Sequence, residues 1–213
     1  LEHLCLFKGK AYDDLKNVAP WIVQLEDGNT FTRNLFTRSD ACWHLWDNEP
    51  GIYVRSRAPL DEMWRHFRTF TRVQDESGRW NYLRFWEPSH MDAYLEAIYH
   101  DRARVGRWLC TRTGNAISFV IIAGLYRQRG ESRPARWFSL QSFPGMQSNQ
   151  PFMIRQFERD VFARTRRADF VMRLDKDLSR AVPEFSAIDP PTRDRRIQRE
   201  IEVASAHGIR REK

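Results

Sequence analysis

Residues 59–88 read PLDEMWRHFRTFTRVQDESGRWNYLRFWEP, and this stretch decides the fold. It opens with proline and two acidic residues, which suit the first turn of a helix and its dipole. Apolar residues then recur along one helical face, namely at Leu60, Met63, Trp64 and Phe67. Two strand-like runs, 70–74 and 80–86, flank a turn in which Gly78 can take a positive φ. The stretch therefore predicts a helix, a β-hairpin and, from Pro88, a second amphipathic helix.

Further strand-like segments lie on both sides of this stretch. They are short and apolar, at 4–7, 20–25, 51–55, 118–125 and 136–140. The run 118–125 is almost continuously apolar, which is typical of a central strand that is covered on both faces. The segment 31–46 favours one or two short helices. Together these signals predict a mixed sheet with flanking helices.

The pattern changes after the loop 143–150. Three helices are expected beyond it, over 151–167, over 170–182, and around Ile197, Ile201 and Ala204. We therefore assign an α+β fold, with a mixed β-sheet and flanking helices in an N-terminal lobe and a small helical C-terminal lobe. The two lobes are expected to cover 1–148 and 149–213.

Composition narrows the class of protein. The chain has 213 residues, enough for one large domain with a smaller lobe, and 41% of them are hydrophobic, which argues against disorder. No apolar run approaches the ~20 residues that a membrane-spanning helix needs. Three widely spaced cysteines suit a reducing compartment, and no secretion leader is visible. We expect a cytoplasmic protein without a membrane segment.

Motifs of catalytic chemistry are missing from the sequence. It contains no nucleophile elbow, glycine-rich phosphate loop, C-x-x-C pair or H-E-x-x-H. His44 and Asp47 are spaced to orient an imidazole, but we favour a simple contact on a helix surface. Cys42 would not face His44 and is expected to be structural. We predict no enzyme activity, no metal and no cofactor, although a triad assembled from distant residues remains a third possibility.

Positive charge is concentrated in the middle of the chain. Residues 101–150 contain eight arginines and two acidic residues, a net charge of +6. Arginine suits bidentate contacts with carboxylates and phosphates. The candidates for contact with an acidic partner are Arg102, Arg104, Arg107, Trp108 and Arg112. The same arginines and tryptophans could also bind nucleic acid. Alternatively, these side chains form a solvated face that keeps the chain soluble.

Two segments resemble a known bacterial family, the domain of unknown function 4123. They are the run 6–25, with its Ala19-Pro20-Trp21-Ile22 strand, and the run 66–88, which ends in Leu83-Arg84-Phe85-Trp86-Glu87-Pro88. The chain departs from the family pattern at Glu87, where Asp is usual, and at Ser89, where Arg is common. Members of the family begin with an extra strand and helix, so the resemblance also implies that the N-terminal lobe is incomplete here.

The resemblance implies a function. Members of this family look like adaptor chaperones of the bacterial type VI secretion system, which bind a toxic effector and help load it onto the VgrG spike. The expected partners are therefore an effector protein and VgrG. Nucleic-acid binding through the arginine-rich middle is the alternative. Trp86 joins the arginine-rich group as a candidate partner-binding residue, because Trp and Arg dominate interface hot spots.

Overall fold

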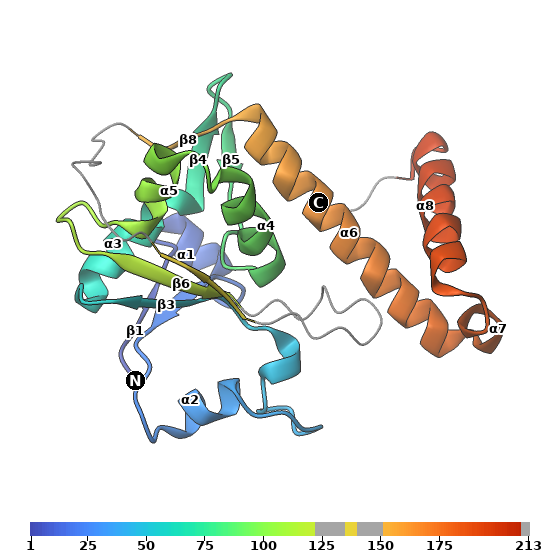
Figure 1. Ribbon diagram of the computed structural model, residues 1–213, viewed down its shortest axis with the longest axis horizontal. Coiled ribbons are helices and arrows are strands. Elements are labelled where there is room, and N and C mark those ends of the chain that lie inside the picture. Colours follow the sequence, from blue (N-terminus) through green and yellow to red (C-terminus); the bar gives the residue numbers. More distant parts are fainter. Residues whose placement is uncertain (122–134, 140–150, 210–213) are drawn as a thin grey trace. The chain divides into compact units, whose positions relative to one another are not determined.

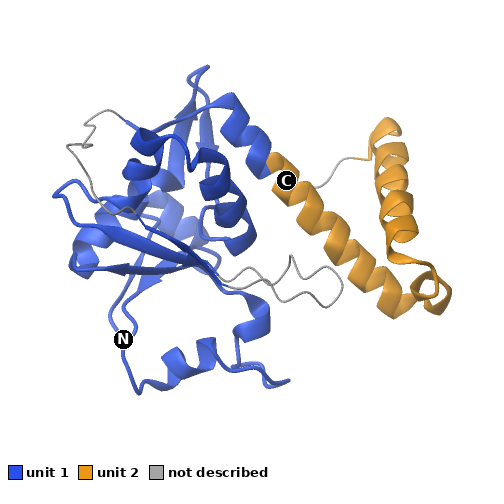
Figure 2. Ribbon diagram, in the orientation of Figure 1, with its two compact units in different colours: residues 1–162 blue, residues 163–213 orange. Residues whose placement is uncertain are grey.

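A computed structural model describes residues 1–121, 135–139 and 151–209 of the chain. The chain divides into two compact units, residues 1–162 and residues 163–213, which are coloured separately in Figure 2. The predicted boundary near residue 148 lies outside the described residues. The segment 151–162, expected in the helical lobe, is part of the first unit.

The first unit contains both helices and short strands (Figure 1). Its strands are β1 (His3–Cys5), β2 (Trp21–Val23), β3 (Tyr53–Ser56), β4 (Arg72–Asp75), β5 (Trp80–Tyr82), β6 (Ile117–Ile121), β7 (Arg136–Phe138) and β8 (Met153–Ile154). Its helices are α1 (Lys10–Leu15), α2 (Thr30–Leu35), the 3-10 turn η1 (Trp46–Asn48), α3 (Leu60–Thr71), α4 (Pro88–Ile98), α5 (Arg102–Leu109) and the start of α6 (Gln156–Ala181).

The strands form three small sheets. β1 pairs with β2, β6 lies between β3 and β7, and β4 lies between β5 and β8. All pairs are antiparallel except β4 with β8, which makes the third sheet mixed. The α+β class predicted from sequence is confirmed, and β6 is the central strand of its sheet, as expected. The predicted strand ends at 122–125 and at 140 lie outside the described residues.

Helix α3 shows how the apolar stripe positions the elements around it. Met63, Phe67 and Phe70 are buried on one face. Trp64 is half-buried, and its Nε1 donates a hydrogen bond of 2.6 Å to the carbonyl of Cys5. Through this bond and its apolar face, α3 is joined to the first sheet on one side and to the core on the other.

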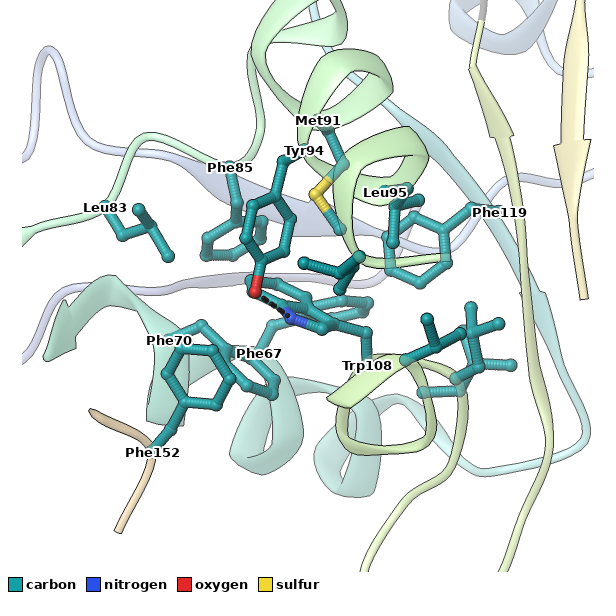
Figure 3. Close-up of a cluster of buried hydrophobic side chains, with 14 of the residues drawn as sticks. Phe67, Phe70, Leu83, Phe85, Met91, Tyr94, Leu95, Trp108, Phe119 and Phe152 are labelled. Atoms are coloured by element: carbon teal, nitrogen blue, oxygen red, sulfur yellow. Dashed lines mark hydrogen bonds between the residues drawn. The ribbon is translucent and has the colours of Figure 1, made fainter. Parts of the chain in front are cut away.

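The core of the first unit is aromatic and centres on Trp108, which is fully buried (Figure 3). Phe70 stacks on Trp108 with ring centroids 3.8 Å apart and an interplanar angle of 17°. The indole Nε1 donates a 3.1 Å hydrogen bond to the hydroxyl of Tyr94, which is equally buried. Phe152, just before β8, meets both Phe70 and Trp108 edge to face. Because Phe152 packs here, the residues after 150 complete this core and do not begin a separate lobe.

The second unit is helical. It contains the remainder of α6, the short α7 (Pro183–Ser186) and α8 (Pro190–Ala206), packed around Val171, Phe185 and Ile197. The sequence predicted two helices over 151–167 and 170–182, whereas one helix spans 156–181. No glycine or proline occurs within α6 to interrupt it. Asp189 caps α8 by accepting a hydrogen bond from the backbone of Thr192.

The elements that had not been predicted include the short helices α1 and α7, helix α5 and strand β8. Helix α5 covers Arg102–Leu109, and its first turn is capped by Asp101, whose side chain accepts from the backbone N–H of Arg104 at 3.0 Å. Strand β8 pairs in parallel with β4 over two residues. Its brevity explains why its sequence carries no strand signal.

Candidate partner-binding site

An apolar groove of about 980 Å³ lies in the first unit. Its walls are two extended segments, residues 18–25 around β2 and residues 50–60 around β3. Between them lie apolar side chains from other elements: Leu6, Met63, Phe67, Phe85 and Trp86. The groove is therefore lined as a site for an apolar chain would be.

The sheet topology explains why these walls remain open. β2 pairs with β1 along one edge, and β3 pairs with β6 along one edge. In the part of the chain that the structure describes, neither strand has a partner on its second edge. Unpaired strand edges readily accept another chain.

Large apolar side chains along the groove are exposed to solvent. Val18 is 77% exposed, and Trp21 and Phe31 are each 42% exposed. Contiguous exposed apolar surface is uncommon on a monomer and marks surfaces that bind other molecules. The groove can thus gain substantial hydrophobic stabilisation when a ligand covers it.

The charged side chains that line the groove have one sign. They are Arg55 and Arg57, which are both exposed. Neither makes an ion pair with any residue in the described ranges. An apolar segment that carries a carboxylate therefore suits this groove better than one that carries a basic residue.

Of the candidate residues proposed from sequence, Trp86 lies at this groove. It is half-buried, its ring meets Phe7 and Phe85 edge to face, and its backbone oxygen lies 3.8 Å from the position that a Cβ on Gly51 would take. Trp86 therefore connects the core to the groove.

Arg104 and Trp108 are placed differently from the expectation. Trp108 has no exposed surface and Arg104 is 9% exposed, so neither presents its side chain to a partner. The prediction of one accessible basic cluster is therefore wrong for Arg104 and Trp108, because both are buried. Their positions on α5 turn them towards the core, because the apolar residues of the helix, Val105, Trp108 and Leu109, fall on that side.

Arg104 is one half of a buried ion pair. Its guanidinium donates from Nε to Glu158 Oε1 at 2.6 Å and from Nη2 to Glu158 Oε2, and the Glu158 side chain is completely buried. Tyr94 also donates to Glu158, at 3.0 Å, and so does the backbone N–H of Arg155, at 2.7 Å. The Arg104 guanidinium lies 3.9 Å from the centre of the Phe152 ring. The pair is thereby surrounded by hydrogen-bond donors and aromatic surface.

The electrostatics of this network follow from burial. Burial and the neighbouring Glu158 carboxylate raise the pKa of Tyr94 far above its usual range. Burial opposes the charge of Arg104, but its hydrogen bonds to the Glu158 carboxylate and the negative charge of that group raise its pKa overall. The network holds α4, α5 and the start of α6 together, which is a structural role.

The remaining arginines of the candidate group are more accessible. Arg102 and Arg112 are exposed. Arg107 is half-buried, with its guanidinium 5.7 Å from the Phe152 ring, and burial together with Arg104 lowers its pKa. None of the three lines the groove. The candidate residues of α5 and Arg112 are thus divided between the core and the surface.

The other residues weighed for catalysis are not brought into a triad. The Nδ1 atom of His44 lies 2.5 Å from the hydroxyl of Ser39, whereas Asp47 accepts hydrogen bonds from Arg38, so Asp47 does not orient the imidazole. Cys42 is exposed, in contrast to the structural cysteine that was expected. Within the described ranges no three His, Cys, Asp or Glu side chains gather as a metal site, and no helix is long and apolar enough to cross a bilayer.

Sequence reasoning missed most of the groove. The apolar residues of 20–25 and 51–55 predicted strands correctly, and strand residues of this kind are usually buried. Whether both edges of a strand are covered depends on the order of strands in the sheet, which local patterns do not report. The exposure of Val18 and Phe31 carried no separate signal.

Comparison with known proteins gives one match. A family model described as Domain of unknown function (DUF4123) matches residues 1–104. No curated protein and no solved structure matches the chain. The matched range contains every residue that lines the groove. Residues 1–104 therefore form a DUF4123 domain, and the groove lies within it.

Proposed function

We propose that this protein is a cytoplasmic, non-enzymatic adaptor chaperone of a bacterial type VI secretion system. In this role it binds a toxic effector and helps to load it onto the VgrG spike. The family membership of residues 1–104 supports the proposal through the resemblance of that family to such adaptors.

The observation that carries the proposal is the open apolar groove. A chaperone of this kind must cover an aggregation-prone segment of its effector and release it later. The groove offers exposed apolar walls, two unpaired strand edges and two arginines that have no acidic partner in the described chain. An extended apolar segment of the effector with an acidic residue near Arg55 and Arg57 satisfies all three features.

The test is affinity purification of the full chain from its native host, followed by mass spectrometry. We expect one large effector and a VgrG protein at defined stoichiometry. Recovery of nucleic acid alone would favour the alternative function, in which exposed arginines bind phosphates. Recovery of neither protein would refute the adaptor proposal.

A groove variant makes the test specific. Val18→Glu combined with Phe31→Glu places two charges on exposed groove positions, so folding should be little affected. We expect effector binding to weaken at least about tenfold, or ~1.4 kcal/mol. Trp43→Glu is the matched control, because Trp43 is 62% exposed and does not line the groove. Equal binding by both variants would show that the effector binds elsewhere.

A further inference from the structure

The third sheet, β5-β4-β8, presents a face whose apolar side chains are about half exposed, with the ring of Phe7 meeting that of Tyr82 at a centroid distance of 6.1 Å. Successive residues of a strand point to opposite faces, and the cross-strand pairs place one set together. This set is Arg72 and Gln74 of β4, Trp80 and Tyr82 of β5, and Met153 of β8. Trp80 is 53%, Tyr82 59% and Met153 49% exposed. The opposite face, with Val73 and Ile154, is buried in the core.

The sheet has two edge strands, β8 with two residues and β5 with three. In the described part of the chain β5 pairs with β4 alone. The N–H of Asp75 bonds the carbonyl of Arg79, and the N–H of Leu83 bonds the carbonyl of Thr71. In an antiparallel pair, residues that bond to the partner alternate with residues whose backbone groups point away. The N–H and C=O groups of Trp80 and Tyr82 therefore point out of the sheet, towards its open edge.

The composition of this face is that of a protein-binding surface. Trp, Tyr, Met and Arg are the residue types enriched at interfaces, and Trp, Tyr and Arg at their hot spots. The guanidinium of Arg72 lies 4.4 Å from the centre of the Trp80 ring, so its charge lies above β5 and near the edge. Among the five residues of the face Arg72 is the one that carries a charge, and it forms no ion pair with the described part of the chain.

We propose that β5 accepts an extended segment of a partner protein as an additional strand. The backbone of that segment would pair with Trp80 and Tyr82, its apolar side chains would cover their rings, and a carboxylate would lie beside Arg72. Strand addition of this kind draws affinity from main-chain hydrogen bonds and specificity from alternate side chains. None of the five residues of this face lines the groove, and only the identity of the partner, effector or spike protein, rests on the function proposed above.

The test selects ligands without assuming that identity. A library of random twelve-residue peptides is displayed on phage and selected on the full chain, with counter-selection on the Trp80→Ser, Tyr82→Ser variant. We expect the enriched peptides to combine Asp or Glu with alternating β-branched or aromatic residues. Failure to enrich any peptide, or enrichment of basic peptides, would overturn the proposal.

An enriched peptide is then synthesised and titrated by fluorescence anisotropy. We expect Trp80→Ser, Tyr82→Ser to weaken binding at least tenfold, and Arg72→Gln to weaken it severalfold and reduce its dependence on salt. Trp137→Ser is the matched control, because Trp137 is 56% exposed but lies on β7 of another sheet. Equal loss in the control, or none in the Trp80 variant, would contradict the assignment of the surface.

Backbone pairing is tested on the peptide. Peptides that carry N-methyl groups on alternate amides lose one set of donors at a time. Methylation of the set that faces β5 should abolish binding, and methylation of the other set should leave it within threefold. Equal effects would exclude strand addition. A twelve-residue thymidine oligonucleotide that competes with the peptide at equal or lower concentration would show that the face binds nucleic acid instead. If the peptide binds as expected but neither effector nor VgrG is recovered from the native host, the adaptor function fails while this inference stands.

Discussion

Removing the guanidinium of Arg104 should destabilise the fold far more than removing any exposed arginine of the same helix. Arg104→Met keeps most of the side-chain volume but leaves the Glu158 carboxylate buried with only two donors, the Tyr94 hydroxyl and the Arg155 N–H. Breaking a buried pair by removing one partner costs about 3–5 kcal/mol, because an uncompensated charge remains. Domains have a total stability of roughly 5–15 kcal/mol, so this loss is large.

The assay is urea unfolding, monitored by circular dichroism and by the fluorescence of the tryptophans. The double variant Arg104→Met, Glu158→Gln removes both charges. The amide oxygen of the introduced glutamine can still accept hydrogen bonds from the Tyr94 hydroxyl and the Arg155 N–H. The double variant should recover about 2 kcal/mol or more of the loss, which a double-mutant cycle reports as coupling energy. Arg102→Met is the control, since Arg102 is exposed two residues away, and it should stay within about 0.5 kcal/mol of the wild type. A cost below about 1 kcal/mol for Arg104→Met, or equal costs for both arginines, would refute the role given to the buried pair.

Three further predictions concern stability and are checked by chemical or thermal unfolding. His66 is buried, its Nε2 donates to the carbonyl of Trp108 at 3.1 Å, and burial lowers its pKa to about 4. The unfolded chain therefore binds a proton at higher pH than the folded chain. Lowering the pH from 7 to 5 should reduce the free energy of unfolding of the wild type by about 2 kcal/mol more than that of the His66→Gln variant. Parallel curves of unfolding free energy against pH would contradict this. Gly78 has φ +80°, so Gly78→Ala should cost about 1 kcal/mol, whereas Gly51→Ala, where φ is not positive, should be neutral within about 0.5 kcal/mol; equal effects would show that the turn is not strained. A chain that ends at residue 162 should melt cooperatively, and one that ends at residue 150 should be much less stable because it lacks Phe152, β8 and Glu158; equal melting would place these residues outside the core.

Elements with strong local signals were predicted well from the sequence. The spacing of Met63 and Phe67 gave α3, Pro88 marks the first residue of α4, and Gly78 takes the positive φ that the turn required. In each case a few neighbouring residues determine the backbone. Helix α5 was missed because its arginines were interpreted as a surface, although Asp101 is an ordinary capping residue at its start.

The candidate site was predicted less well, because charge in a sequence does not report burial. Arg102 and Arg104 are two positions apart and lie on different sides of α5, one in solvent and one beside Glu158. Glu158 is 54 residues further along the chain, and no sequence pattern near Arg104 indicates that the two residues form a pair. A count of arginines over 101–150 therefore combined residues with unrelated roles.

The same network explains why the boundary of the first unit falls within a helix. Glu158 and Phe162, near the start of α6, are buried in the core of the first unit. Val171, later on the same helix, is part of the second core. Helix α6 contains no glycine or proline and continues through the boundary. The sequence pattern therefore changes where the strands end, which is earlier in the chain than the point where the two cores separate. The ion pair with Arg104 anchors the first turn of α6 within the first unit, and residues further along the same helix contribute to the second core. Removing the Arg104 guanidinium should therefore weaken the attachment of the first turn of α6 to α4 and α5, which Tyr94, Arg104 and Glu158 join.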